Sequence, residues 1–564
     1  MRLLHAKTLK FQEFDDSDVP PYAILSHTWD YGSEVSFQDM SSLYVPSKKG
    51  YAKIIETCRL AVHHGLEYIW VDTCCIDKTN SGELSEAINS MFRWYQRSQV
   101  CFVYLADYKV EGIRNYFPSD CRWLKRGWTL QELLAPSRVH FYDKDWYPLG
   151  TKTDLAPLIE RITHIPTHAI LGLEPLSSYS VAQRMSWASL RTTSKIEDQA
   201  YSLLGLFDIN MPLIYGEGTR AFQRLQEEII KRNGDLTILA WKPTSTCDDV
   251  CPILASSPLA FQDSHDILPF SPTGVDFSLS NRGLRVTRQL GVVTRSDGDI
   301  QQPLTYGFVI GYTQETPYSV VSIPLKKIGY ALYIRESYPG IMKHSPTKWR
   351  SMAATRNHML CIAQSVPPHL TDSRAMTTMT PSSALSPTSS MGPYHGAVHI
   401  PVFKNIKMIP GSGLPTGAYD EVNRVSFRPD GTYNSVVAYS FVAKTTPTTE
   451  FKFAILFDFQ DYRREPRPVM VDKSSPASKL LYLLLLRHPD EPMSWVDVDE
   501  ELPEISSLGH GLRFKVEGKT MELTASIAPR SVVVDDKTME MSVLDIQLAD
   551  ITEMSYPTTT FYHR

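Results

Sequence analysis

The sequence lacks any apolar run long enough to cross a membrane. Its longest run, Leu480–Leu486, is far shorter than the roughly 20 residues that a membrane helix needs. The first residues, MRLLHAKTLKFQEF, carry charges where a signal peptide has an apolar core. The last four, FYHR, contain no prenylation box. We therefore expect a soluble cytoplasmic protein with no membrane span.

Cysteines are also few and poorly spaced for metal or disulfide chemistry. The eight cysteines include no C-x-x-C pair, and Cys247 and Cys251 have no second Cys or His pair at zinc-ligand spacing. Such sparse cysteines are typical of a reducing compartment, and a zinc site is not expected. No metal is therefore predicted.

Neither charge sign dominates the chain. Lys and Arg number 57 against 62 Asp and Glu, which gives a net charge of −5, so nucleic acid is not an expected partner. Gly518-Lys519-Thr520 resembles the end of a phosphate-binding loop, but Arg513 stands where that loop needs glycine. No nucleotide triphosphatase module is predicted. At 564 residues, the chain is long enough for two or three domains.

Three short apolar runs are the main feature that is present. Tyr22–Trp29, Tyr68–Asp77 and Val100–Asp107 each end in polar residues, and amphipathic segments separate them. This alternation predicts a parallel sheet with crossover helices. Ligands bind such sheets outside the carboxyl ends of the strands. Ser26, His27, Asp72 and Asp107 should therefore lie along one rim of the sheet.

Further signals complete an N-terminal α/β domain, residues 1–245. They predict a helix within 50–64, a helix capped by Asn80 with Glu83 three residues later, and a helix after Gly218 with an outward Glu227–Lys231 pair. Residues 137–142 and 236–241 have the composition of short strands.

Residues 246–564 have a different sequence pattern, which predicts an antiparallel β-rich module, sandwich or barrel. A Ser/Thr/Pro-rich excursion interrupts it at about 366–394. The segments of strand length and alternation are 283–290, 306–312, 318–323, 330–335, 436–442, 451–459, 512–516, 521–527 and 541–548.

Four sequence blocks resemble the heterokaryon-incompatibility (HET) domain of filamentous fungi. They are YAILSHTW, IWVDTCCIDK with the following GELSEAINSMFRWYQRSQVCFVYLAD, RGWTLQELLAP (126–136), and residues 191–229. Asp30 departs from the family, which usually has Gly after LSHTW. HET domains are in turn remotely similar to TIR domains, some of which cleave NAD. The resemblance implies a flavodoxin-like, TIR-type parallel sheet with flanking helices, and a role in non-self recognition and regulated cell death.

The resemblance also implies a set of site residues. Glu132 would stabilise the oxocarbenium ion that forms when nicotinamide leaves the ribose of NAD. Trp128 would form a wall of the site, and Ser26 and His27, at the rim with Trp29, would contact ribose or phosphate. NAD would be a substrate, and no cofactor is implied. TIR-like enzymes complete their site at an interface, so self-association is expected, with an allelic or sensor protein as a further partner.

Each of these residues also has a structural interpretation. Thr129-x-x-Glu132 has the spacing of a capping box, and His27 could be bonded to a carbonyl. Asp72 could contact the substrate, or it could be held by loop amides or by Arg126, and Arg126 could equally bind a phosphate. Trp128 could belong to the core. The function predicted is that of a fungal cell-death effector, with cleavage of NAD as its candidate activity. The alternatives are a non-enzymatic assembly module and a ligand sensor acting through the β-rich module.

Overall fold

The computed structural model describes residues 1–42, 44–110, 120–244, 249–270, 274–297, 300–352, 358–365, 397–403, 406–409, 419–420, 425–426, 435–444, 450–459, 467–472, 493–494, 511–516, 519–534 and 537–552. The chain divides into two compact units. The first comprises 1–245, 254–275 and 310–321, and the second comprises 246–253, 276–309 and 322–564. The domain boundary at 245 stays a prediction, and the predicted excursion at 366–394 lies outside the described residues.

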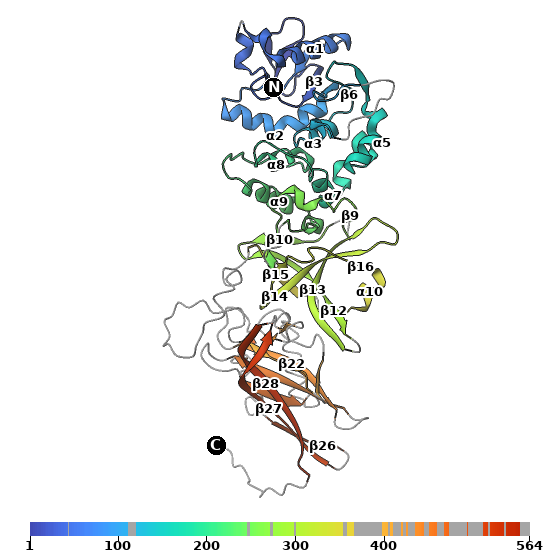
Figure 1. The fold of residues 1–564 in the computed structure, drawn as a ribbon. Coiled ribbons are helices and arrows are strands. Elements are labelled where there is room, and N and C mark those ends of the chain that lie inside the picture. Colours follow the sequence, from blue (N-terminus) through green and yellow to red (C-terminus); the bar gives the residue numbers. More distant parts are fainter. Residues whose placement is uncertain are drawn as a thin grey trace. The chain divides into compact units, whose positions relative to one another are not determined.

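The first unit contains a seven-stranded sheet with the order β2-β1-β4-β3-β5-β6-β7 (Figure 1). Its centre is parallel: β3 (Tyr22–His27) pairs with β4 (Tyr68–Trp70) and β5 (Val100–Tyr104), and β5 pairs with β6 (Val139–Tyr142). Every residue of β3 is buried, as expected of a strand with a neighbour on each side and helices on its faces. The predicted parallel sheet is confirmed.

Antiparallel strands complete both edges of this sheet. β1 (Arg2–His5) pairs with β2 (Phe11–Glu13) and with β4, and β7 (Pro148–Thr151) pairs with β6. The sequence patterns did not predict the β1–β2 hairpin.

Two crossover helices connect the first three parallel strands. Helix α1 (Lys49–His63) leads from β3 to β4, and α2 (Ser81–Arg97) leads from β4 to β5. The chain moves to one side of β3 in the first connection and to the other side in the second. Since such connections are right-handed, the two helices lie on opposite faces of the sheet, as Figure 1 shows. Strands β3 and β5 therefore flank the point where the strand order reverses, which is where α/β sheets bind ligands.

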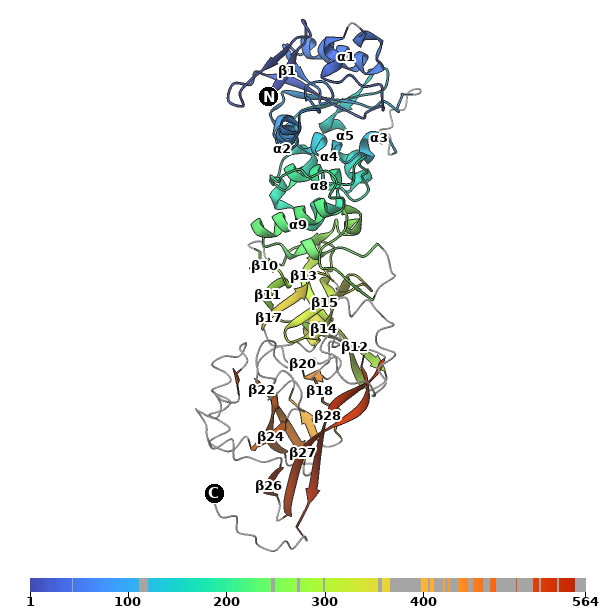
Figure 2. The same cartoon turned by 90° about the vertical axis from the view of Figure 1, so that its left-hand side faces the viewer.

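Short helices follow the sheet, and α8 and α9 lie side by side in Figures 1 and 2. Segment 236–241, predicted as a strand, instead begins with the 3-10 helix η5 over residues 236–239, which the Asp235 carboxylate caps. Lys231 pairs with Glu228 at 2.6 Å, rather than with Glu227 as predicted. The helices of this unit not yet named are η1 (Gln38–Ser41), η2 (Val45–Ser47), α3 (Arg122–Lys125), α4 (Thr129–Leu134), α5 (Lys152–Thr163), α6 (Thr167–Leu171), η3 (Leu176–Ser178), α7 (Val181–Ser186), α8 (Asp198–Tyr201), η4 (Leu204–Leu206), α9 (Arg220–Arg232), η5 (Leu236–Leu239) and η6 (Pro258–Phe261).

The later part of the chain is β-rich, and every segment predicted there as a strand overlaps one. Its elements are β8 (Val250–Cys251), β9 (Ile267–Leu268), β10 (Phe277–Ser280), β11 (Gly283–Arg288), β12 (Gly291–Asp297), β13 (Ile300–Thr313), β14 (Val320–Gly329), β15 (Leu332–Glu336), β16 (Met342–His344), α10 (Pro346–Ser351), β17 (His358–Ala363), β18 (Val398–His399), β19 (Ile406–Met408), β20 (Tyr419–Asp420), β21 (Val425–Ser426), β22 (Ser435–Lys444), β23 (Glu450–Phe459), β24 (Arg467–Asp472), β25 (Met493–Ser494), β26 (Gly511–Val516), β27 (Lys519–Val534) and β28 (Lys537–Asp550).

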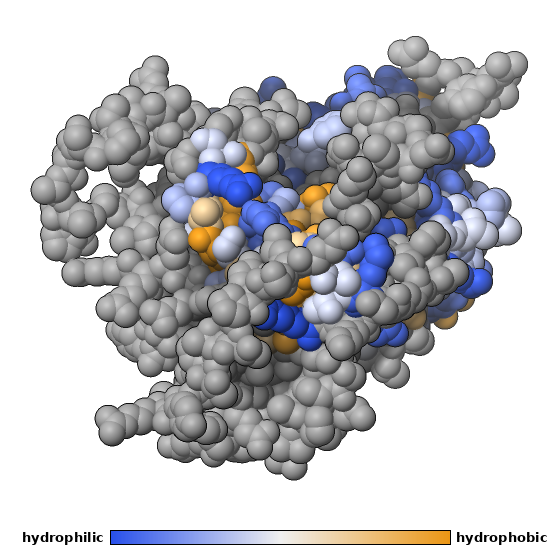
Figure 3. Space-filling view, turned by 90° about the horizontal axis from the view of Figure 1, so that it is seen from below, coloured by the Kyte–Doolittle hydropathy of each residue, from blue (hydrophilic) through white to orange (hydrophobic). Residues whose placement is uncertain are grey.

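These strands form sheets of ten, six and five strands, and β27 and β28 make a long hairpin, drawn in red in Figure 2. Pairing is mostly antiparallel, but β15 pairs with β17 and β18 with β28 in parallel. The prediction of a purely antiparallel module is therefore wrong in these two pairs. Both join strands that are distant in sequence, so no local turn signal marks them. In the space-filling view of Figure 3, hydrophobic side chains of the described residues are interspersed with hydrophilic ones. No helix in the described part of the chain is long and apolar enough to cross a membrane.

Candidate functional site

A buried serine and a buried carboxyl meet at the carboxyl end of β3. The Ser26 hydroxyl donates a hydrogen bond to Glu132 Oε2 on α4. The same hydroxyl oxygen accepts a 2.7 Å hydrogen bond from the indole N–H of Trp123 on α3. Ser26 is 0% exposed and Glu132 is 5% exposed. Two predicted site residues are thus brought together, at the point where the strand order reverses.

The environment of Glu132 favours its protonated form. Burial raises the pKa of this carboxyl to about 8, and the negative charge of Asp72 adds to the rise. Hydrogen bonds from Ser26 and Tyr95 and the positive charge of Arg126 oppose it without cancelling it. Removal from water raises the free energy of the ionised carboxyl by more than these partners lower it. Glu132 is therefore largely neutral near pH 7.

The capping box suggested by Thr129-x-x-Glu132 does not form. Helix α4 begins at Thr129, and its N-cap residue, Trp128, makes no side-chain cap. The Thr129 hydroxyl instead donates to the Arg126 carbonyl at 2.8 Å and accepts from the half-buried Arg191 at 2.9 Å. The structural interpretation of Glu132 as a capping residue is therefore wrong, because its carboxyl bonds to Ser26 across the unit.

A second polar chain runs from His27 to the surface through Asp72. His27 Nε2 lies 3.0 Å from Asp72 Oδ1, and the Trp29 indole N–H donates to Asp72 Oδ2 at 2.9 Å. Burial would raise the pKa of Asp72, but the His27 hydrogen bond and the charges of Lys78 and Arg126 hold it well below its usual range. His27 bonds to a carboxylate and not to a carbonyl, so both partners are side chains of the predicted site.

Trp29 forms the exposed part of this cluster. Its side chain is 37% exposed, and two cations lie over its ring, with Lys78 Nζ at 3.6 Å and Arg126 Cζ at 4.7 Å from the ring centroid. Neither cation makes an ion pair within 4 Å with a carboxylate in the described part of the chain. Arg126 acts on Asp72 through its charge, without a direct bond. Sequence reasoning missed Lys78, although it follows directly in the IWVDTCCIDK block.

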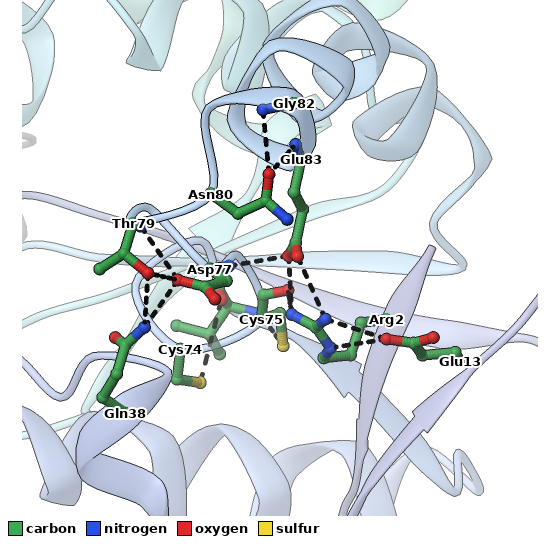
Figure 4. A network of polar contacts seen from close by, with 11 residues as sticks. Arg2, Glu13, Gln38, Cys74, Cys75, Asp77, Thr79, Asn80, Gly82 and Glu83 are labelled. Carbon is green, nitrogen blue, oxygen red and sulfur yellow. Dashed lines mark hydrogen bonds and ion pairs between the residues drawn. The ribbon is translucent and has the colours of Figure 1, made fainter.

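The loop that carries Asp72 and Lys78 is held by a polar network (Figure 4). Glu83 accepts from the backbone N–H of Asp77 at 2.7 Å and from Arg2 at 2.7 Å. Asn80 accepts from the backbone N–H groups of residues 82 and 83 and caps α2 as predicted. Glu83 does not return to the Asn80 backbone, so only half of the predicted capping box forms. The network fixes the loop after β4 beside Trp29.

The Trp128 side chain bonds to helix α8 and not to Ser26 or Glu132. Its indole N–H donates to the Asp198 carboxylate at 3.2 Å, and the Tyr215 hydroxyl donates to the same carboxylate at 3.0 Å. The charged residues 191, 197 and 198 likewise serve the fold, since Glu197 accepts from the backbone N–H groups of Gly216 and Gly218. Trp128 thus lies among the helices that follow the sheet.

His27 also faces a partly buried ion pair that sequence reasoning missed. Its Nδ1 lies 3.9 Å from Glu34 Oε2 and has no hydrogen-bond partner among the described residues. Glu34 pairs with the buried Lys53, whose ammonium also donates to the Thr28 carbonyl at 3.1 Å. Within the described ranges, no cluster of His, Cys, Asp and Glu could hold a metal ion.

Comparison with known proteins places this site in a family context. The family model described as heterokaryon incompatibility protein (HET) matches residues 22–117, and a domain of unknown function (DUF8212) matches residues 220–299. Vegetative incompatibility protein HET-E-1 of Podospora anserina is 46% identical over 237 residues, which is 40% of this chain and 17% of that protein. The chain thus corresponds to about a sixth of the length of this relative. No solved structure matches the chain. The residues from β3 to the segment after β5 belong to the matched range, and the chain therefore carries a heterokaryon incompatibility (HET) domain.

Proposed function

We propose that this protein acts in fungal heterokaryon incompatibility as a cell-death effector, and that its HET domain cleaves NAD to nicotinamide and ADP-ribose. The observation that carries the catalytic part is the Glu132 carboxyl at the carboxyl end of β3, bonded to Ser26. The similarity to HET-E-1 over 237 residues supports the incompatibility role.

The strand order supports a flavodoxin-like, TIR-type core. Numbered along the chain, the four parallel strands β3, β4, β5 and β6 have the order 2-1-3-4. The flavodoxin-like order is 2-1-3-4-5, with its ligand between the first and third strands. The following strand here, β7, is antiparallel, so the similarity covers four strands. Ser26 and His27 end the first of them.

The proposed chemistry needs one carboxylate and one water molecule. The bond between nicotinamide nitrogen and ribose C1′ breaks, and its electron pair leaves with neutral nicotinamide. Glu132 as a carboxylate stabilises the oxocarbenium ion that remains. Water oxygen then bonds to C1′, and one proton is released. The product is ADP-ribose, so atoms and charge balance.

The positive charge of the substrate can ionise Glu132, which is neutral in the free protein. The nicotinamide ring of NAD is cationic, and a nearby positive charge favours the ionised form of a carboxyl. Binding would therefore lower the pKa of Glu132 from about 8 and produce the carboxylate where it is needed. In this proposal the free protein holds the group protonated and inactive.

The exposed cluster is suited to the rest of the substrate. Lys78 and Arg126 both lie over the Trp29 ring and make no direct ion pairs to described carboxylates, so both can meet the pyrophosphate. The Trp29 ring can stack on a base, and His27 can contact ribose. Because Glu132 is only 5% exposed, we propose that self-association opens the path to it.

The test uses the full chain, forced to assemble, and follows nicotinamide release from NAD. Glu132→Gln should abolish release, because the amide cannot carry the negative charge. Glu86→Gln is the matched control, since Glu86 is exposed on α2. Equal release from wild type and Glu132→Gln would refute the catalytic role.

A non-enzymatic assembly role is the second candidate, and the close packing of Glu132 and Ser26 favours it. In that case no nicotinamide is released in any assembled state, and growth arrest of a fungal host persists in Glu132→Gln.

A further inference from the structure

We propose that a cavity in the first unit, separate from the Ser26–Glu132 pair, binds a small organic anion, a phosphate or a carboxylate. The cavity has a volume of about 870 Å³ and lies among α2, the turn after α4, α6, α7, η4 and α9. This volume is within the range of small-molecule sites. Glu132, Ser26 and the Trp29 cluster do not line it, so the inference is independent of NAD cleavage.

The charges on the cavity wall are predominantly positive. Four cationic side chains line it, with only two carboxylates, Glu174 and Asp208. The chain as a whole carries a net charge of −5, so this excess is local. Clefts lined by one sign of charge concentrate ligands of the opposite sign. The cationic residues are Arg93, Lys152, Arg184 and Arg232.

Lys152 is a buried cation without a buried anion. It is 2% exposed, and its ammonium donates to the carbonyls of Pro136 at 2.7 Å and Leu134 at 3.4 Å. No carboxylate in the described part of the chain lies within ion-pair distance of it. Burial lowers its pKa to about 8. Such a charge is costly to bury unless an anion joins it.

Arg184 repeats this arrangement on α7. It is 5% exposed, donates to the Leu206 carbonyl at 2.9 Å, and lies 4.5 Å over the Phe207 ring. Its Nε has no hydrogen-bond partner among the described residues, and burial lowers its pKa to about 10. A guanidinium can bind a phosphate or carboxylate in bidentate geometry, and the unpaired Nε–H of Arg184 is one donor for such a contact.

A structural role for both cations is the competing explanation, because each satisfies carbonyls near a helix end. A neutral donor could make those hydrogen bonds without burying charge, and two buried cations without an ion pair on one cavity wall need a further reason, although the Asp235 charge partly offsets that of Arg184. Close packing at Gly205 supports a well-formed cavity wall, since a Cβ there would lie 2.1 Å from the Phe92 side chain. The wall between α2 and η4 is therefore tightly packed.

The test is calorimetric titration of the full chain with phenyl phosphate and with phthalate, using benzyl alcohol as the uncharged ring. These probes avoid nucleotides and nicotinamide analogues, which the proposed NAD site would also bind. We expect at least one anion to bind and benzyl alcohol not to bind. Arg184→Met and Lys152→Met should each weaken binding about tenfold or more, the effect of losing a hydrogen bond to a charged group.

Arg232→Gln keeps the proposal testable if a buried variant fails to fold, because Arg232 is exposed at the rim and donates only to the Asp208 carbonyl among the bonds described. It should also weaken binding, by several-fold. Arg59→Met, at an exposed pair with Glu56 on α1, is the matched control and should not change it. Absence of binding by both anions at millimolar concentration would overturn the proposal. Binding that survives all three cavity variants would also overturn it.

Discussion

The hydroxyl of Ser26 ties the end of β3 to helix α4 by donating to the Glu132 carboxyl. The contact spans 106 residues of sequence, and it joins the reversal point of the strand order to the segment that follows the sheet. Trp123 closes the arrangement by donating to the same Ser26 oxygen. One hydroxyl thus serves two buried groups.

Ser26→Ala should therefore destabilise the protein. The substitution leaves the Trp123 indole N–H and the Glu132 carboxyl without this partner, and an unsatisfied buried polar group costs about 1–3 kcal/mol. We expect a loss of roughly 2 kcal/mol or more in the free energy of unfolding, measured by denaturant titration at pH 7. Ser81→Ala, at an exposed position of α2, should stay within about 0.5 kcal/mol of wild type. Equal stability of the two variants would contradict this role of Ser26.

The raised pKa of Glu132 makes stability depend on pH. The folded protein holds the proton up to about pH 8, whereas the unfolded chain releases it near pH 4.5. The stabilisation is therefore complete below about pH 4.5 and is lost as the pH rises through about 8. Relative to Glu132→Gln, wild type should lose roughly 5 kcal/mol at most over this window. Chemical unfolding across pH 4–9 measures the difference, and parallel curves for the two proteins would exclude the raised pKa.

Asp72→Asn should narrow the pH range over which the free energy of unfolding falls. The Asp72 charge raises the pKa of Glu132, so its removal lets the carboxyl ionise at lower pH. We expect the pH-dependent loss of stability to end below the wild-type value of about 8. The same unfolding series checks this, with Asp77→Asn as the control, because Asp77 lies in the same loop but bonds to Thr79 and Gln38. An unchanged window in Asp72→Asn would show that the two carboxyls are not coupled.

Asn80→Ala should cost about 1 kcal/mol of stability, the usual effect of losing an N-cap. The side chain accepts from two backbone N–H groups at the start of α2, and this helix start anchors the loop that carries Lys78. Thermal unfolding at neutral pH measures the loss. Asn80→Asp, which retains the cap, should restore most of it; failure of that rescue would argue against capping as the cause.

Local patterns predicted much of this fold. The apolar runs that became β3, β4 and β5 are continuous in sequence, and Asn80 caps the helix whose residues follow it directly. The strand segments of the β-rich part were also found, since alternation is a local signal. The parallel pairs β15–β17 and β18–β28 were not, because strands far apart in sequence leave no turn between them.

Hydrogen-bond partners that are distant in sequence explain the wrong predictions at the site. Thr129-x-x-Glu132 has the spacing of a capping box, yet the carboxyl prefers a hydroxyl 106 residues away. Glu83 likewise reaches Arg2 and the Asp77 amide instead of the Asn80 backbone. Residues 236–241 have strand composition, but the Asp235 carboxylate caps a 3-10 turn there. Sequence spacing shows which bonds are possible, and packing decides among them.

The pH profile of nicotinamide release tests the central claim most directly. With the assembled full chain, kcat/KM reports the protonation of the free protein, and Glu132 must be ionised to act. The account predicts that kcat/KM rises with pH to a midpoint near 8, that Asp72→Asn moves the midpoint to lower pH, and that Glu132→Gln releases no nicotinamide. Release by Glu132→Gln with the wild-type profile would contradict the account.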